Sequence, residues 1–309
     1  MIKIISIFIF LYINLYSSVL NYTIEPSYKD IQKHSHIKIL DSKELMIKDS
    51  KGNEITELSA LAYASNKLYA LSDSGKLYHF NIDLSNDKID KIELTKTFKL
   101  KSKKGKRLKK IKRDSEGLVF YDGKLLISFE RKHRIAMFDL DGNYIKNKKL
   151  HRDLENLENF KSSNKGLESV AYSKKYGVVT APEAPLTTTD DKYHTIYSKD
   201  KTWKFKRYSS ITALEFIDDD NLMILERKFS WITFHRVTTI SSIDLSSCEN
   251  SICKAKTLAV LDSYKNWKID NFEGLTKVGK DKFLMVSDDN GMFYQKTLLV
   301  LFEISKPEF

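Results

Sequence analysis

The stretch Ser115-Glu116-Gly117-Leu118-Val119, followed by LISFE at 126–130, is the clearest copy of a two-part phrase that recurs along this chain. Its first part has the pattern of a short inner strand that carries an acidic residue. Its second part has the pattern of an apolar strand whose last residue is acidic. The acids of the first part are Glu116, Glu168, Glu215 and Glu273. Those of the second part follow 11 to 15 residues later, at Glu130, Glu183, Glu226 and Asp288. A weaker upstream copy has Ser59 in place of the first acid.

The spacing of these copies predicts the fold. Counted from Ser59, the first-part positions are 57, 52, 47 and 58 residues apart. Repeats of this length indicate one supersecondary unit used several times. Four short antiparallel strands, repeated radially, form the blade of a β-propeller. We therefore predict an all-β chain with a β-propeller fold. An open β-sandwich or a pair of β domains would explain the alternation of apolar residues, but not the recurring acid.

Five repeats predict five blades, although a sixth would fit within the long segments 80–112 or 183–210. The fifth repeat supplies only three strands, and HIKIL at 36–40 is the candidate for its fourth. N- and C-terminal strands would then close the ring within one blade, which leaves only short, protected sheet edges. One credible helix lies around 152–160.

The N-terminus has the layout of a secretory signal peptide: a basic start, an almost wholly apolar run over 4–16, and small polar residues at 17–18. We predict a signal peptide over 1–18, a linker over 19–35 and the propeller domain over 36–309. The apolar run is short for a membrane span, and an uncleaved anchor is the alternative. The predicted location is periplasmic or secreted, with no transmembrane domain after signal cleavage.

The two cysteines, Cys248 and Cys253, are five residues apart between strand-like segments. In an oxidising compartment so close a pair forms a disulfide across a turn. The alternatives are a metal site, for which no histidine lies nearby, and two free thiols.

The net charge of +11 comes from one segment. Residues 96–113 contain eleven of the 52 basic residues and no acid, so the rest of the chain balances at 41 against 41. Such a run could bind nucleic acid, anionic lipid head groups or a phosphorylated ligand. Phe98 is its only aromatic residue, which argues against base stacking and sequence-specific nucleic-acid binding. We predict a solvated loop between two blades.

Equivalent residues of successive blades become neighbours around the central channel, so the acids should form two rings. Clustered carboxylates repel one another unless a positive charge offsets them. Calcium binds several oxygen ligands, and arginine binds a carboxylate through two nitrogens. The structural alternative is that each acid accepts hydrogen bonds from backbone amides and ties blades together.

Motifs of a nucleophilic hydrolase are absent from the sequence. There is no Gly-x-Ser-x-Gly, and the seven histidines lack metal-ligand spacing. Hydrolysis by this chain would therefore use metal-activated water with carboxylate bases.

Several short phrases together carry a family resemblance: DSEG at 114–117, SFER at 128–131, NKGLES at 164–169, LER at 225–227, NFEGL at 271–275, VSDDN at 286–290 and QKT at 295–297. Over about 40–305 the chain resembles the phytase-like family, also called "esterase-like activity of phytase". The resemblance implies a β-propeller in an exported bacterial protein and an association with phosphate-ester hydrolysis.

These observations give the following site prediction. The expected calcium ligands are Glu116, Glu168, Glu273, Asp288, Asp289 and Asn290. Arg131 and Arg227 are expected to attract an anionic substrate. The other channel acids are Glu130, Glu183, Glu215 and Glu226. Since Ser59 interrupts the ring, the site is expected off-centre, beside the blade that carries Glu273 and Asp288.

The predicted function is that of an exported phytase-like propeller that hydrolyses phosphate or carboxylic esters with the help of a metal and takes a small anionic ester as substrate. The alternative is a non-enzymatic binding propeller whose partner is a component of the bacterial envelope. No residue is assigned as catalytic.

Overall fold

The second repeat folds as its turn residues predict. The structure, a computed structural model, describes residues 18–27 and 36–305. Asp122 and Gly123 both have positive φ angles, 48° and 69°, as a tight two-residue hairpin requires. They join β7 (Ser115–Tyr121) to β8 (Lys124–Phe129), and β9 (Arg134–Phe138) and β10 (Tyr144–Asn147) complete this sheet.

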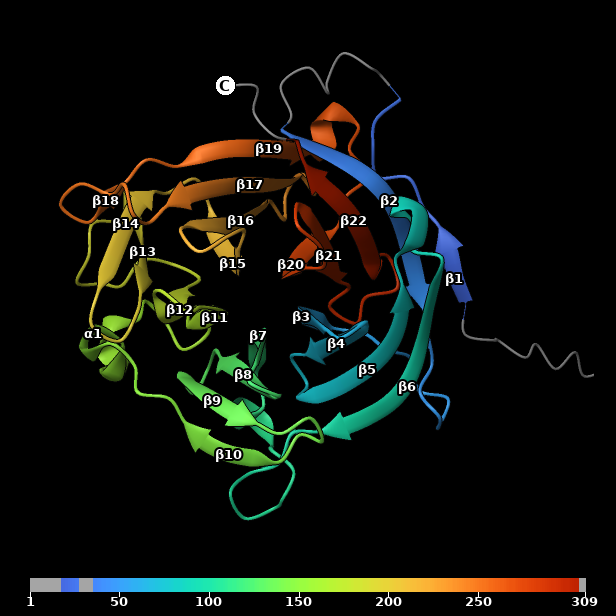
Figure 1. Cartoon of the computed structure of the whole chain (residues 1–309), viewed down its shortest axis with the longest axis horizontal. Helices are drawn as coiled ribbons and strands as arrows, with labels where there is room; N and C mark the ends of the chain where they lie inside the picture. Colours follow the sequence, from blue (N-terminus) through green and yellow to red (C-terminus); the bar gives the residue numbers. More distant parts are fainter. Residues whose placement is uncertain (1–17, 28–35, 306–309) are drawn as a thin grey trace, which may run out of the picture.

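Five such sheets stand around a central axis, with their first strands innermost (Figure 1). Blade one contains β3 (Leu58–Ala64), β4 (Lys67–Ser72), β5 (Lys76–Asp83) and β6 (Lys91–Lys99). Blade two contains β7 to β10. Blade three contains β11 (Leu167–Ser173), β12 (Gly177–Pro182), β13 (Tyr193–Tyr197) and β14 (Thr202–Lys206). Blade four contains β15 (Ser210–Phe216), β16 (Asn221–Phe229), β17 (Arg236–Asp244) and β19 (Lys256–Asp262). Blade five contains β20 (Asn271–Lys277), β21 (Lys282–Asp288), β22 (Leu298–Ile304) and β2 (Ile37–Met46). The predicted five-bladed propeller is confirmed.

Both ends of the described chain meet in blade five, as predicted. The N-terminal strand β2 pairs antiparallel with the C-terminal strand β22, with Ile37 opposite Ile304 and Glu44 opposite Leu298. A further strand, β1 (Ser18–Asn21), extends the outer edge of this blade. The predicted signal peptide lies outside the described residues except for Ser18.

The hydrophobic core lies between neighbouring blades rather than at the axis. One cluster joins Leu71 and Leu77 of blade one to Leu125 and Ile127 of blade two. Because blades pack on both faces of each sheet, second strands such as β4 and β8 are buried almost throughout, which explains their continuous apolar runs. This packing fixes the inner strands around the channel.

The helix expected at 152–160 is one turn, α1 (Arg152–Glu155), followed by a 3-10 turn (Leu157–Asn159). Cys248 and Cys253 form the predicted disulfide, and Cys253 lies in the short strand β18 (Ile252–Cys253), which pairs with β14. The basic segment begins within the end of β6 and continues through the connection to β7, and most of its lysines are exposed. Among the described residues, no helix has the length and apolar character that a membrane crossing needs.

Candidate functional site

Every inner strand carries one β-bulge at the same level of the channel. In blade two, Ser115 pairs with Phe129 and Gly117 with Ser128, so that Glu116 between them has no partner in the ladder. A bulge leaves its extra residue unpaired and turns its side chain out of the regular alternation. The same bulge occurs in all five blades. We call the five unpaired bulge residues the first ring: Ser59, Glu116, Glu168, Thr212 and Glu273.

Glu215, which the sequence places in this ring, lies elsewhere. The bulge of β15 is at Thr212, three residues earlier. The Glu215 carboxylate accepts hydrogen bonds from the backbone N–H groups of Phe216 (2.9 Å) and Lys277 (3.2 Å), and so connects blades four and five. Burial raises the pKa of Glu215 to about 7. Glu215 therefore has the structural role of an acid that accepts backbone N–H groups and ties two blades together.

The second ring consists of the residues at the mouth of the channel that face the starts of the inner strands. In three blades the second-ring residue donates its backbone N–H to the backbone carbonyl of the residue just before the inner strand. These pairs are Asp73 to Glu57, Glu130 to Asp114 and Glu183 to Gly166. In the other two blades the equivalent residues pair within the ladder, Arg227 with Ser210 and Asp288 with Asn271. The second ring is therefore Asp73, Glu130, Glu183, Arg227 and Asp288.

Glu226 lies one residue before this ring and points elsewhere. Its side chain is fully buried, and Oε1 accepts the backbone N–H groups of Tyr208 (3.0 Å) and Ser209 (2.9 Å). His194 Nε2 lies 3.6 Å from the same oxygen. The predicted assignment of Glu226 to the channel is corrected: it anchors the connection between blades three and four, and blade four contributes Arg227 to the ring instead.

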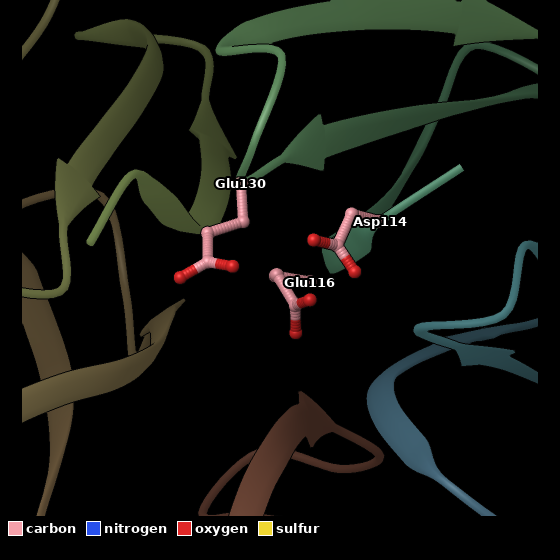
Figure 2. A group of neighbouring side chains, drawn as sticks. All are labelled: Asp114, Glu116 and Glu130. Atoms are coloured by element: carbon pink, nitrogen blue, oxygen red, sulfur yellow. The ribbon is translucent and has the colours of Figure 1, made fainter. Parts of the chain in front are cut away.

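Two groups of three carboxylates lie close enough to hold a metal ion. One comprises Asp114, Glu116 and Glu130, and the other Glu130, Glu168 and Glu183; within each group, one oxygen per residue lies within 4.8 Å of the others. Figure 2 shows the first group converging from the facing ends of β7 and β8. Glu130 belongs to both groups and is only 8% exposed.

Positive charge is scarce around these acids. The two rings and Asp114 together contain eight carboxyl groups, three of which have an ion-pair partner in the described part of the chain. Arg131 Nε lies 2.7 Å from Asp114, Lys165 Nζ lies 2.6 Å from Glu183, and Arg227 Nη1 lies 2.6 Å from Glu273. Glu116, Glu168 and Glu130 are among those left without one.

The electrostatic consequence is a set of raised pKa values. Burial, and then the neighbouring carboxylates, raise the pKa of Glu116 and Glu168 well above the ordinary value. The same two causes raise the pKa of Glu130 to about 8. Burial also raises the pKa of Asp114, despite the opposing charge of Arg131. Such a site either holds protons or binds a cation, and its oxygen donors suit a hard cation such as calcium.

The predicted centre beside blade five is organised differently. Arg227 already pairs with Glu273. Asp289 accepts the N–H groups of Glu57 (2.9 Å) and Gly291 (3.0 Å) and the hydroxyl of Thr297 (2.7 Å). Asn290 is an exposed loop residue whose side-chain amide donates to Gln295.

Asp288 remains in the second ring, and burial and then Glu273 raise its pKa to about 9. Among the described residues, the groups of three metal-ligating side chains lie on blades two and three, not on blade five.

The sequence missed Asp73 and Asp114 as site residues, although Asp114 belongs to the phrase DSEG and Asp73 ends KLYALSD at 67–73, the second part of the weaker upstream copy. Both predicted substrate-binding arginines are paired with protein acids, Arg131 with Asp114 and Arg227 with Glu273. The Arg131 side chain stays half exposed, whereas that of Arg227 is one-quarter exposed.

Access to the acids is from the mouth. Between the inner strands, a cavity lined by Glu116, Thr212 and Glu273 of the first ring has only about 10 Å³, room for about one water molecule. At the mouth, a pocket of about 320 Å³ adjoins the second ring. Its lining includes Lys165, Glu183, Arg227, Phe229 and Trp231.

Comparison with known proteins agrees with the repeated phrases. Residues 53–291 match the model of the family described as Phytase-like, esterase-like activity of phytase. The chain belongs to the phytase-like family. No curated protein matches this family member. Among solved structures, a PQQ-bound aldose sugar dehydrogenase from Streptomyces coelicolor is similar at 9% identity, with 86% of this chain and 97% of that chain covered and a TM-score of 0.48. The Dos1 propeller is similar at 10% identity, with 85% and 73% covered and a TM-score of 0.36.

Proposed function

We propose that this phytase-like protein is an exported hydrolase of phosphate or carboxylic esters that works with calcium bound at the channel mouth. The observation that carries the proposal is the pair of carboxylate groups that share Glu130. Among the described residues, Asp114 and Glu183 have ion-pair partners, and Glu116, Glu130 and Glu168 have none. The disulfide and the signal-like N-terminal sequence support export to the periplasm or the outside.

The residues fit a hard cation. Asp114, Glu116, Glu130, Glu168 and Glu183 offer carboxylate oxygens only, and calcium takes six to eight oxygens, water included. Arg131 and Lys165 each hold one of these acids by an ion pair and so fix its orientation. A bound calcium ion would polarise the ester and lower the pKa of a water molecule.

The chain's own groups have defined tasks in this proposal. Glu130 is buried and lies between the two groups, so it is the best-placed base for a proton from water. Lys165 and Glu183 both line the mouth pocket, and the Lys165 ammonium group would attract an anionic ester. Arg227 offsets Glu273 and keeps the blade-four side of the mouth from adding further negative charge.

The test combines activity with calcium binding. Purified protein is assayed on a panel of phosphate and carboxylic esters, with calcium or with chelator, and melting is followed under both conditions. We expect calcium-dependent turnover and a calcium-dependent rise in Tm, both reduced in Glu116→Gln and Glu130→Gln. Glu215→Gln is the matched control, because Glu215 is also a buried acid with a raised pKa but lies outside the rings. No turnover in either condition, together with no calcium-dependent melting shift, would exclude the proposal.

The exposed lysines of 103–112 favour the second candidate, a binding propeller that contacts an anionic envelope component. This candidate predicts binding without turnover. Neutralising Lys103, Lys104, Lys109 and Lys110 should then weaken binding to phosphate-rich ligands, and unchanged binding would remove it.

A further inference from the structure

The mouth pocket joins two chemically different walls. On one side are Glu183, a member of the second carboxylate group, and Lys165, whose Nζ lies 2.6 Å from both oxygens of Glu183. On the other side are aromatic residues from two adjacent blades: Phe229 at the end of β16, Trp231 in the turn that follows it, and Tyr294 in the loop between β21 and β22. One pocket of about 320 Å³ therefore reaches from the carboxylates to an aromatic wall.

The aromatic wall is ordered by contacts within the protein. Phe229 and Trp231 meet edge to face with ring centroids 4.8 Å apart, and the Arg236 guanidinium lies 5.2 Å from the centre of the Phe229 ring. The Trp231 side chain is nevertheless 72% exposed. Such exposure of a large aromatic residue beside a pocket is typical of a ligand-binding surface.

Resting on the function proposed above, we propose that this pocket binds anionic esters that carry an aryl group. The anionic head lies at the Lys165 ammonium group, and the ring lies against Phe229, Trp231 and Tyr294. Stacked or edge-to-face contact with these rings removes apolar surface from water and favours a flat group over a methyl group. A sugar or polyol in this place would instead bind through the polar lining residues, such as Asn271 and Gln295.

Trp231 supplies a readout that needs no turnover. The other two tryptophans, Trp203 and Trp267, are 6% and 5% exposed, so a ligand in the pocket should alter chiefly the emission of Trp231. Phenylphosphonate and methylphosphonate share a head group with a carbon–phosphorus bond and differ in the ring. Benzoate and acetate form a second such pair for a carboxylate head.

We expect the aryl member of at least one pair to bind about tenfold more tightly than the methyl member by calorimetry and to quench Trp231 emission. Calcium should strengthen binding of both members of a pair. The ratio of their dissociation constants should be the same in chelator, because it depends only on contact of the aryl group with the aromatic wall. Trp231→Ala should reduce the ratio to near one, and Trp231→Phe should retain most of it without the emission change. Trp203→Phe is the control and should retain both.

Equal affinities within both pairs, or an aryl preference that survives in Trp231→Ala, would overturn the proposal. Stronger binding of glucose phosphate than of phenylphosphonate would also overturn it, in favour of a sugar site. Ester turnover without aryl preference would contradict this pocket assignment alone. Aryl binding that depends on Trp231, in a protein without turnover, would contradict the hydrolase proposal alone.

Discussion

Replacing Glu130 by glutamine should change stability in opposite directions with and without calcium. Glu130 is 8% exposed, belongs to both carboxylate groups, and has its pKa raised from 4.5 to about 8 by burial and by Asp114 and Glu183. At 1.36 kcal/mol for each unit of pKa, a rise from 4.5 to about 8 corresponds to at most about 5 kcal/mol. Because neighbouring acids can retain their protons instead, we expect about 2 kcal/mol in practice, or about 4 °C in Tm.

The sign follows from proton binding. The folded state binds this proton more tightly than the unfolded state does, so the free energy of unfolding falls as the pH rises from about 4.5 to about 8. In chelator, Glu130→Gln should therefore equal the wild type near pH 4.5 and exceed it by about 4 °C at pH 9.

Calcium should reverse this order. At a free concentration of 100 Kd, calcium stabilises the wild type by about 2.7 kcal/mol, which exceeds the variant's advantage of about 2 kcal/mol in chelator. The variant lacks one ligand of both groups, and we expect it to gain less than the difference, about 0.7 kcal/mol. The assay is thermal melting over pH 4.5–9 with calcium or chelator, with Glu215→Gln as the control that should not alter the calcium effect. The same order of Tm in both conditions, or a wild type that gains stability from pH 5 to 8 in chelator, would refute the reasoning.

Three further predictions concern the frame of the site. Arg227→Met should lose about 3 kcal/mol of stability, because Glu273 is left partly buried without its partner. Adding Glu273→Gln should restore most of this loss. A double variant no more stable than Arg227→Met would contradict the prediction. Gly166→Ala should lower Tm and weaken calcium binding, because a Cβ there would lie 2.2 Å from the backbone oxygen of Glu130 and displace it. An unchanged calcium affinity, measured by calorimetry, would argue against this prediction. Replacing both cysteines of the disulfide by serine should cost about 2 kcal/mol, the value for so short a loop, and leave calcium binding intact; denaturant melts and titration measure the two.

The sequence predicted the architecture because the relevant signals are local. Hairpin turns such as Asp122-Gly123, continuous apolar second strands and an acid at their ends recur with each blade. The sequence provides only three strands for blade five and a candidate fourth at 36–40, and the pairing of β2 with β22 confirms that closure.

The sequence predicted the membership of the rings less well. In blade four, the phrase at 213–217 resembles the others, yet its bulge is at Thr212, and the ring positions fall to Thr212 and Arg227 instead of Glu215 and Glu226. A shift of one residue along a strand turns a side chain to the other face. Without the register, adjacent residues such as Glu226 and Arg227 cannot be assigned to the channel or to the core.

A five-bladed all-β ring with acids at its centre follows from turn chemistry and apolar periodicity, because both act over a few residues. Which of the acids gather depends on contacts between blades. Arg227 reaches Glu273 from the neighbouring blade, while Glu130 stands between Asp114 and Glu116 on one side and Glu168 and Glu183 on the other. The candidate centre therefore lies on blades two and three, where Glu116, Glu130 and Glu168 have no ion-pair partner among the described residues. Contacts between blades decide where a positive side chain lies, and no single repeat encodes them.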